Sequence, residues 1–260
     1  MKIVICGAGN VAKFFCHRLS AQQEIEIVQV YARNSESARL IAESYQVPVI
    51  QQLADMRTDA DAYILAVNDT AITTLGQQLP LAADAIVLHC AGSQPLQATG
   101  AGREQSAVLW PIYSITPQAF DKEAVPLVVD AGPLAIAKAM QMARAISQQV
   151  FTANYEQRKY LHLNAVLVNN FVHHLLVVAE NICQQEGLDF DILKPIVKQT
   201  IERMDSAGFA AAQTGPARRG DAPTMHQHLE LMAQKPEWQA MYKVISDSIA
   251  MMYGGDGTGR

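Results

Sequence analysis

The chain has 260 residues, of which 50% are hydrophobic and 17% charged, and its formal net charge at pH 7 is -5. This length and composition allow a large core in one or two domains. The sequence contains no block of basic residues that would indicate nucleic-acid binding. The sequence contains no continuous run of about 18 apolar residues that would indicate a membrane span. Because the first strand is predicted to begin at residue 2, we expect no signal peptide. The four cysteines have no C-x-x-C spacing, so we expect reduced thiols in a cytoplasmic protein without a disulfide or a metal site.

The first twelve residues predict a nucleotide-binding turn. Lys2 to Cys6 is a strand-like run, Gly7 to Ala12 fits the pattern G-x-G-x-x-A, and a helix is predicted over Val11 to Ala21. Gly7 permits the tight turn, Gly9 lets the backbone approach a pyrophosphate, and the helix N-terminus favours the phosphate charge. We expect the dinucleotide to contact Gly7, Ala8, Gly9, Asn10 and Val11. The alternative is an ordinary tight turn between a strand and a helix.

The second predicted strand, Glu26 to Tyr31, ends without the carboxylate that NAD-preferring folds use to bind the ribose hydroxyls. Arg33 instead places a cation where the 2′-phosphate of NADP would lie. We therefore expect NADP (NADPH) as the cofactor, with Ala32, Arg33, Asn34 and Ser35 around its adenosine end. Alternatively, Arg33 is a solvated loop residue. Ser35 is also expected to cap a helix over Glu36 to Tyr45.

Further strands are predicted over Val47 to Ile50, Ala62 to Val67, Ala85 to His89, Ala107 to Trp110 and Leu127 to Asp130. Helices are expected over 71–79 and 133–149, and the alternation of strand and helix predicts an α/β fold with a doubly wound, mostly parallel sheet. Ligands lie at the carboxyl ends of such strands. We therefore expect Val67, Asn68, Asp69, Ala91, Gly92 and Ser93 near the nicotinamide, and His89, Ser93, Tyr113 and Ser114 facing the cleft. Asp69 or Thr70 alternatively serves only as a helix cap.

From about Asn154 the pattern becomes helical. The first predicted helix, Tyr155 to Glu186, is apolar around most of its circumference, which is typical of a central, buried helix. At about 100° per residue, one narrow stripe of this helix contains Lys159, His162, Asn169, Asn170 and His173. Polar groups on such a helix need partners or face a cleft. The stripe is therefore a candidate catalytic surface, and the alternatives are satisfied core residues or a dimer contact.

The remaining chain predicts three helices, over Asp189 to Ser206, Met225 to Ala233 and Pro236 to about Tyr253. The segment 214–224 is expected to be an ordered, non-helical loop that ends with Thr224 as a cap. Arg218 or Arg219 in this loop could clamp a substrate carboxylate, or both are solvated. We expect a dinucleotide-binding domain over 1–153, a helical substrate and dimerisation domain over 154–253, and a frayed tail over 254–260.

Five segments carry a family resemblance: GAGNVA at 7–12, AVNDTAI at 66–72, LHCAGS at 88–93, RKYLHLNAVLVNNFVHHL at 158–175 and TGPARRGDAPTMHQHL at 214–229. The chain resembles the two-domain Rossmann-like NADP oxidoreductases related to pyrroline-5-carboxylate reductase and to deazaflavin-dependent NADP oxidoreductases. The C-terminal part of that family is a helical domain of unknown function. The resemblance implies a Rossmann domain followed by an all-α domain like that of 6-phosphogluconate dehydrogenase, a homodimer, and an active cleft between the domains.

The resemblance also places residues. His162, Asn170 and His174 stand where the family's long-helix motif has polar residues, and Arg219, Gly220 and Asp221 match its loop motif. The family often has an Asn-His pair where this chain has His173 and His174, and a more aromatic segment than the one at 110–113. The resemblance therefore says more about fold and cofactor than about substrate.

These expectations combine into an NADP-dependent oxidoreductase that acts on a small anionic carbonyl or imine compound. His162 is the expected proton donor, Lys159 the second choice, and Asn170 an orienting group. Tyr113, Arg218 and Arg219 are the expected substrate contacts. The expected partners are a small-molecule substrate and a second copy of the chain, but no nucleic acid and no membrane.

The rival hypothesis is a non-catalytic NADP-binding redox sensor or partner-binding module. The polar stripe favours the enzyme, because a sensor has no need of it. The rival is favoured by the absence of a lysine four residues before an asparagine, since Lys159 lies five before Asn164. A third possibility is a structural dimer in which the nucleotide only stabilises the fold.

Overall fold

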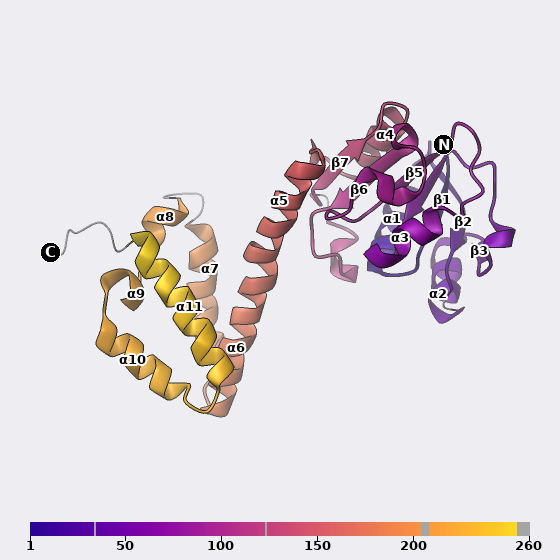
Figure 1. Ribbon diagram of the computed structural model, residues 1–260. Helices are drawn as coiled ribbons and strands as arrows, with labels where there is room; N and C mark the ends of the chain where they lie inside the picture. The colour runs from indigo at the N-terminus through magenta and orange to yellow at the C-terminus, as the bar shows by residue number, and fades with distance from the viewer. Residues whose placement is uncertain (34, 123, 204–207, 254–260) are drawn as a thin grey trace. The chain divides into compact units, whose positions relative to one another are not determined.

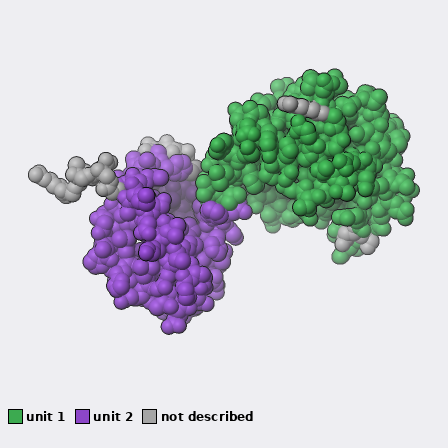
Figure 2. All heavy atoms as spheres, in the orientation of Figure 1, with its two compact units in different colours: residues 1–169 green, residues 170–260 purple. Residues whose placement is uncertain are grey.

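The computed structural model describes residues 1–33, 35–122, 124–203 and 208–253 (Figure 1). The chain divides into two compact units, Met1–Asn169 and Asn170–Arg260 (Figure 2). Strands give way to helices between Thr152 and Tyr155, whereas the division into units falls inside the long helix that begins at Tyr155. The functional boundary at 153/154 stays a prediction, and the tail 254–260 lies outside the described residues.

The first unit is built on an eight-stranded sheet with the order β3-β2-β1-β4-β5-β6-β7-β8. The strands are β1 Lys2–Cys6, β2 Glu26–Tyr31, β3 Val49–Ile50, β4 Ala62–Leu65, β5 Ile86–His89, β6 Ser106–Pro111, β7 Leu127–Ala131 and β8 Val150–Thr152. All neighbouring strands pair in parallel except β6 and β7. The mostly parallel sheet is confirmed. β8 was not predicted, because three residues are too few to establish a strand pattern.

Helices cover both faces of this sheet, because successive side chains of a strand point to opposite faces. Ile3 and Ile5 join the core under α1 (Asn10–Ser20), α2 (Ser35–Tyr45) and α4 (Ile136–Ile146). Val4 and Cys6 join the core under α3 (Asp69–Gly76). Short 3₁₀ turns complete the connections at Leu53–Asp55, Leu96–Thr99, Arg103–Gln105 and Pro117–Ala119.

The predicted long helix is present, but it is not a regular α-helix throughout. It consists of α5 (Tyr155–Ala165), a π-helical segment (Val166–Phe171) and α6 (Val172–Gln185). A capping box begins it, because Asn154 accepts a hydrogen bond from the Gln157 backbone and its own N–H donates to the Gln157 side chain. The i→i+5 bonds of a π-turn insert an extra residue and rotate the next part of the helix by roughly 100°. The polar stripe is therefore interrupted between His162 and His173.

The expectation that this helix is buried is wrong. Within Tyr155–Gln185 the buried residues are Arg158, Val178 and Cys183. An 18-residue window of the helix has a mean hydropathy of 1.4 with 6% of it buried, so by length and composition alone the helix could cross a membrane. One such helix is weak evidence, because core helices of soluble proteins pass the same test. Apolar side chains around a whole helix must be shielded from water, but the shielding surface can belong to the same chain or to another molecule.

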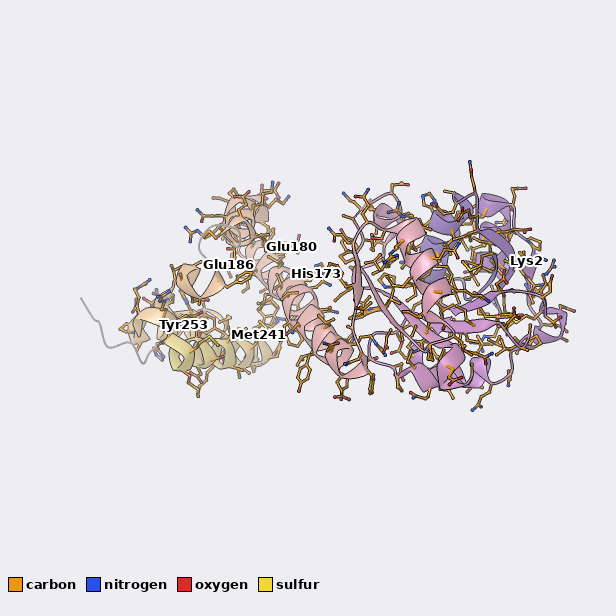
Figure 3. All side chains as sticks on the ribbon, turned by 90° about the horizontal axis from the view of Figure 1, so that it is seen from above. Lys2, His173, Glu180, Glu186, Met241 and Tyr253 are labelled. Atoms are coloured by element: carbon orange, nitrogen blue, oxygen red, sulfur yellow. The ribbon has the colours of Figure 1, made fainter. Side chains whose placement is uncertain are left out.

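The second unit is helical from α6 onward. Its elements after α6 are a 3₁₀ turn at Phe190–Leu193, α7 Lys194–Glu202, α8 Phe209–Ala212, α9 Pro216–Arg219, α10 Ala222–Leu231 and α11 Pro236–Tyr253. Helices α6 and α11 border an apolar cavity of about 320 Å³, lined by Leu175 and Val178 on α6 and Met241 and Ile245 on α11. Figure 3 labels Met241 on α11 and His173 at the start of α6.

The loop predicted over 214–224 is partly helical. Pro216 opens the one-turn helix α9, since its fixed φ suits a first helical position. Gly215 and Gly220, with φ of 108° and 66°, bracket this turn. The cap of α10 is Asp221 rather than Thr224: its carboxylate accepts from the Thr224 backbone N–H at 3.2 Å and from the Thr224 hydroxyl at 2.8 Å.

Candidate dinucleotide site

A cavity of about 350 Å³ lies where β1, β2 and β4 end. Its lining comes from the segments at the ends of these three strands, namely Gly7, Ala8, Gly9, Tyr31, Ala32, Arg33, Ser37, Ala66, Val67 and Asn68. The structure thus brings together seven residues that the sequence assigns to the cofactor. Tyr31, Ser37 and Ala66 were missed, although Tyr31 and Ala66 lie at the strand ends that signalled the site.

The two glycines of the opening turn have different surroundings. Gly7 has a φ of +130° and donates its N–H to the carbonyl of Tyr31 at 2.8 Å. A Cβ on Gly7 would lie 2.1 Å from the Ala66 carbonyl oxygen, so β1 and β4 need a glycine here. A Cβ on Gly9 would meet nothing within 4 Å. Gly9 caps α1 in an extended conformation, and the space beside it is where a pyrophosphate would approach the helix N-terminus.

The rim of this cavity beyond β2 carries positive charge. Arg33 is exposed there, and none of the described residues that line the cavity carries a carboxylate. Asn34 lies outside the described residues, and Ser35 begins α2. Asn10 and Val11 form the first turn of α1.

A hydrogen bond joins the segments after β4 and β5. The Ser93 hydroxyl donates to Oδ2 of Asp69 at 2.9 Å, which brings together two residues expected near the nicotinamide. Asn68, rather than Asp69 or Thr70, is the N-cap of α3, and Asp69 is its first residue. The carboxyl end of the sheet therefore offers a connected polar edge.

His89 does not face a cleft, contrary to expectation. It is fully buried. Its Nδ1 accepts the Ala91 N–H at 3.2 Å, so Nε2 carries the proton and donates to the Pro95 carbonyl at 3.0 Å. Burial lowers the pKa of His89 from 6.5 to about 4. The neutral imidazole holds the loop after β5 in shape and is not available as an acid.

An aromatic pair places His162 beside that loop. Gly92 is buried under Trp110, and a Cβ on it would lie 2.5 Å from Cε2 of the indole. The rings of Trp110 and His162 have centroids 6.0 Å apart. His162 is exposed on α5. The indole of Trp110 therefore lies next to both Gly92 in the loop after β5 and His162 on α5.

Two other residues of unit 1 were predicted to contact the substrate or to supply a proton, Lys159 and Tyr113. Lys159 pairs with Glu156 at 2.6 Å and lies 5.2 Å from the Tyr155 ring centroid. The hydrogen bond to Glu156 raises the pKa of Lys159, so its ammonium stays charged at neutral pH. Tyr113, two residues beyond β6, is 47% exposed.

Asn170, Arg218 and Arg219 belong to the second unit. Asn170 lies in the π-helical segment. Arg218 donates to the Gln213 carbonyl and lies 5.1 Å from the Tyr253 ring centroid. Arg219 is exposed, with Asp221 3.8 Å away. The roles of all three toward a substrate stay predictions.

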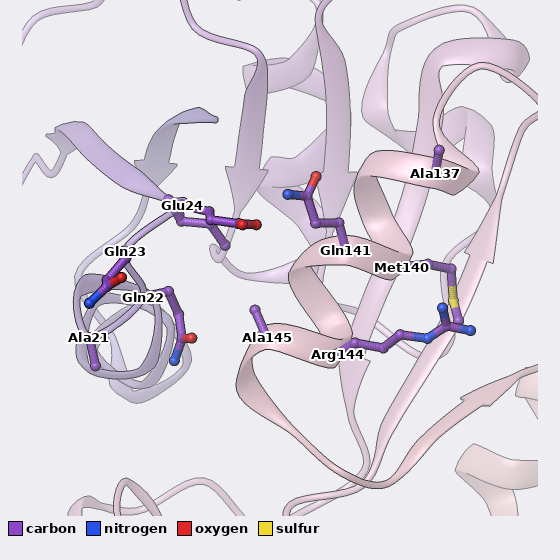
Figure 4. A pocket seen from close by; sticks show the side chains of 10 residues that line it. Ala21, Gln22, Gln23, Glu24, Ala137, Met140, Gln141, Arg144 and Ala145 are labelled. Carbon is purple, nitrogen blue, oxygen red and sulfur yellow. The ribbon is translucent and has the colours of Figure 1, made fainter.

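A more voluminous cavity lies elsewhere. It measures about 880 Å³ and lies between the segment Ala21–Ile25, which leads into the amino end of β2, and the segment Ala137–Ala145 of α4 (Figure 4). Because ligands of such sheets lie at the carboxyl ends of the strands, this cavity is not the dinucleotide site. Among the described residues no cluster of His, Cys, Asp or Glu could hold a metal ion.

Comparison with known proteins agrees with this geometry. Residues 2–92 match the family model "NADP oxidoreductase coenzyme F420-dependent", and residues 125–249 match a domain of unknown function, DUF2520. The structure described as "putative NADP oxidoreductase BF3122" from Bacteroides fragilis shares 32% identity, covering 95% of this chain and 97% of that one, with a TM-score of 0.85. No curated protein matches the chain.

Two more distant structures share the fold. Protein TM1727 from Thermotoga maritima is 21% identical over 94% of this chain and 98% of its own, with a TM-score of 0.76. A pyrroline-5-carboxylate reductase from Coxiella burnetii is 16% identical over 95% and 97%, with a TM-score of 0.59. The match to the NADP oxidoreductase family model and the 32% identity to the Bacteroides structure identify the chain as an NAD(P)-dependent oxidoreductase. The chain belongs to the NADP oxidoreductase family that joins the F420-dependent type of N-terminal domain to a DUF2520 C-terminal domain.

Proposed function

We propose that this protein is an NADPH-dependent reductase of a small anionic carbonyl or imine compound. The observation that carries the proposal is the cavity after β1, β2 and β4, which has Arg33 on its rim, open space beside Gly9 and no carboxylate among its described lining residues. A guanidinium suits a 2′-phosphate, whereas a ribose diol is usually held by Asp or Glu. When bound, NADPH would supply the hydride.

The chain's own task is to orient the substrate and to deliver a proton. His162 is our candidate donor, because it is exposed, titratable and adjacent to Trp110 beside the loop after β5. Lys159 is the second candidate, although its ion pair with Glu156 keeps its proton tightly bound. Asn170 would orient the substrate, and Tyr113 would contact it.

The proposed substrate class includes a carboxylate because two arginines, Arg218 and Arg219, are exposed together in α9. Arg219 is the better clamp, since Arg218 is already engaged with Gln213 and Tyr253. The name of the Coxiella relative describes a substrate of this kind, a cyclic imine that carries a carboxylate. We propose the same general class here, without naming one compound.

The test is NADPH oxidation, followed by absorbance, with a panel of cyclic imine carboxylates, the corresponding imines without the carboxylate, and 2-oxo acids. We expect turnover with anionic members and at least tenfold lower kcat/KM for the neutral analogues. Protein that binds NADPH yet oxidises it with no panel member would contradict the reductase and favour the sensor.

We also propose that the protein acts as a homodimer joined through the long helix. Val168 and Phe171 are 72% and 55% exposed, and further exposed apolar side chains on the same helix are Tyr160, Leu163, Leu167, Val172, Leu175 and Val177. Beyond residue 170, the buried hydrophobic residues in the described chain are only Val178, Cys183 and Ala217. So small a core needs further cover to be stable.

A second copy suits this surface better than a bilayer. The helix carries His162, His173 and His174, and polar groups at membrane depth are costly. A protein partner can pair such groups while it covers the apolar ones. The apolar surface continues at the start of the helix, where Tyr160 and Leu161 border a cavity of about 590 Å³ with Phe151.

We propose a cytoplasmic location, where thiols stay reduced. Cys6, Cys16, Cys90 and Cys183 are all free thiols. Burial raises the pKa of Cys6 and of Cys16 to about 12, so neither is poised for thiol chemistry.

A further inference from the structure

Arg158 is a fully buried guanidinium at the end of the first turn of α5, and the largest side chain with almost no exposure in the described chain. Burying a charge is costly unless it is paired and hydrogen-bonded. The dinucleotide cavity does not include it, and the proposed chemistry does not use it. The groups that Arg158 binds should therefore indicate why a charged side chain is buried at this position.

Four hydrogen bonds from Arg158 reach two different parts of the first unit. Nε and Nη2 donate to Oδ2 of Asp130, at the end of β7, at 3.2 and 3.0 Å. Nη1 donates to the carbonyl oxygens of Gly92 and Gln94 at 2.9 and 2.8 Å. One guanidinium therefore ties the loop after β5 to the nearby antiparallel strand β7.

The same loop is held from its other sides. His89 binds the Ala91 N–H and the Pro95 carbonyl, and the indole of Trp110 lies against Gly92. Between the two carbonyls that Arg158 holds stands Ser93, whose hydroxyl donates to Asp69 across to α3. Holding the carbonyls of residues 92 and 94 therefore fixes the position of Ser93 at the carboxyl edge of the sheet.

We propose that Arg158 is a positioning residue for the nicotinamide half of the dinucleotide site. It acts through the carbonyls of Gly92 and Gln94, which set the Ser93–Asp69 pair before any cofactor arrives. This inference rests on the proposed function. Because Arg158 also lies on the helix of His162, one turn earlier, it keeps the candidate proton donor in register with that loop.

The test separates the two halves of the cofactor. Calorimetric titrations with NADPH and with adenosine 2′,5′-bisphosphate, which lacks the nicotinamide half, are compared for wild type, Arg158→Lys and the double variant Arg158→Met/Asp130→Leu. The double variant removes both charges, so no unpaired buried ion remains to unfold it. Arg144→Met, an exposed arginine of α4 away from the carboxyl edge of the sheet, is the matched control. Amide exchange of residues 91–94, measured without cofactor, reports on the loop itself.

In both Arg158 variants we expect the affinity for NADPH to fall at least tenfold, while the affinity for the bisphosphate stays within twofold of wild type. The amides of residues 91–94 should exchange faster in these variants. Arg144→Met should keep the wild-type affinities and exchange rates. Equal loss of both ligands would reduce Arg158 to a general stabiliser and overturn the proposal. Unchanged NADPH affinity or unchanged exchange in Arg158→Lys would also overturn it. Wild-type protein that binds neither ligand would instead contradict the proposed function, whereas the exchange result alone would still show whether Arg158 fixes the loop.

Discussion

The imidazole of His162 and the indole of Trp110 lie with their ring centroids 6.0 Å apart, tilted by 49°. The contact joins α5 to the end of β6, next to the loop after β5. It gives the exposed histidine a defined position without burying it, as the proposed role of proton donor requires.

Replacing this histidine tests its role. We expect His162→Ala to lower kcat by about 100-fold or more, the usual range for an acid–base group, with NADPH affinity unchanged. His226→Ala, an exposed histidine of α10 paired with Glu230, is the control and should keep wild-type rates. Wild-type turnover in His162→Ala would remove the histidine from the mechanism and leave Lys159 as the candidate.

The two glycines of the opening turn should respond differently to alanine. Gly7→Ala places a Cβ 2.1 Å from the Ala66 oxygen at a positive φ, so we expect a loss of unfolding free energy on the order of 3 kcal/mol. Gly9→Ala meets open space and should change stability by no more than about 0.5 kcal/mol. Its Cβ points where the pyrophosphate would lie, so NADPH affinity should fall at least tenfold. Denaturant unfolding and calorimetry measure the two effects. A Gly9→Ala protein with wild-type affinity would place the phosphates elsewhere.

Stability should depend on pH through His89. Burial, with a contribution from the charge of Arg158, lowers its pKa from 6.5 to about 4, while Asp69, Asp130 and the Pro95 carbonyl oppose that shift. Between these two pH values His89 is protonated in the unfolded chain but neutral in the folded chain. The stabilisation is therefore complete above pH 6.5 and is lost as the pH falls, by up to about 3 kcal/mol near pH 4.

Urea unfolding at pH 7, 6, 5 and 4 measures this dependence. His89→Asn, whose side chain does not titrate, should show a flatter profile over this range, although it is less stable at pH 7. His226→Asn should keep the wild-type slope. Equal slopes in wild type and His89→Asn would mean that other groups set the acid sensitivity.

The exposed face of the long helix should be a subunit interface. We expect Phe171→Asp to convert a dimer into a monomer in size-exclusion chromatography with light scattering, because an aspartate there would be buried without a partner. Leu134→Asp is the matched control, since Leu134 is 60% exposed but lies outside the helix. A monomeric wild type, or wild-type protein that floats with phosphatidylcholine vesicles, would reject the dimer proposal.

The sequence predicts the first half of the fold well because short-range patterns determine it. β1 and β2 begin and end at the predicted residues, and the other predicted strands are displaced by at most two residues at either end, since buried β-branched runs between turns leave little freedom. Gly7 and Gly9 are recognisable from their spacing alone. Their different roles cannot be recognised in the sequence, because only the position of the Ala66 carbonyl distinguishes Gly7 from Gly9.

The long helix shows where such patterns fail. A wheel at constant pitch cannot represent the π-helical segment, so the predicted stripe joined His162 to residues that the turn rotates away. Its apolar circumference predicted burial within one chain, although the cover need not come from the same molecule. Arg158 was not singled out at all, because its partners Gly92, Gln94 and Asp130 are distant in sequence and nothing local announces them.

The most direct test of the central claim is a calorimetric titration of purified protein with NADPH and NADH, repeated with Arg33→Ala and, as a control on the neighbouring exposed arginine of α2, Arg39→Ala. We predict that NADPH binds at least tenfold more tightly than NADH, a difference of about 1.4 kcal/mol. Arg33→Ala should abolish this preference, and Arg39→Ala should preserve it. Equal binding of the two cofactors by wild type would contradict the role of Arg33, and binding of neither would contradict the reductase itself.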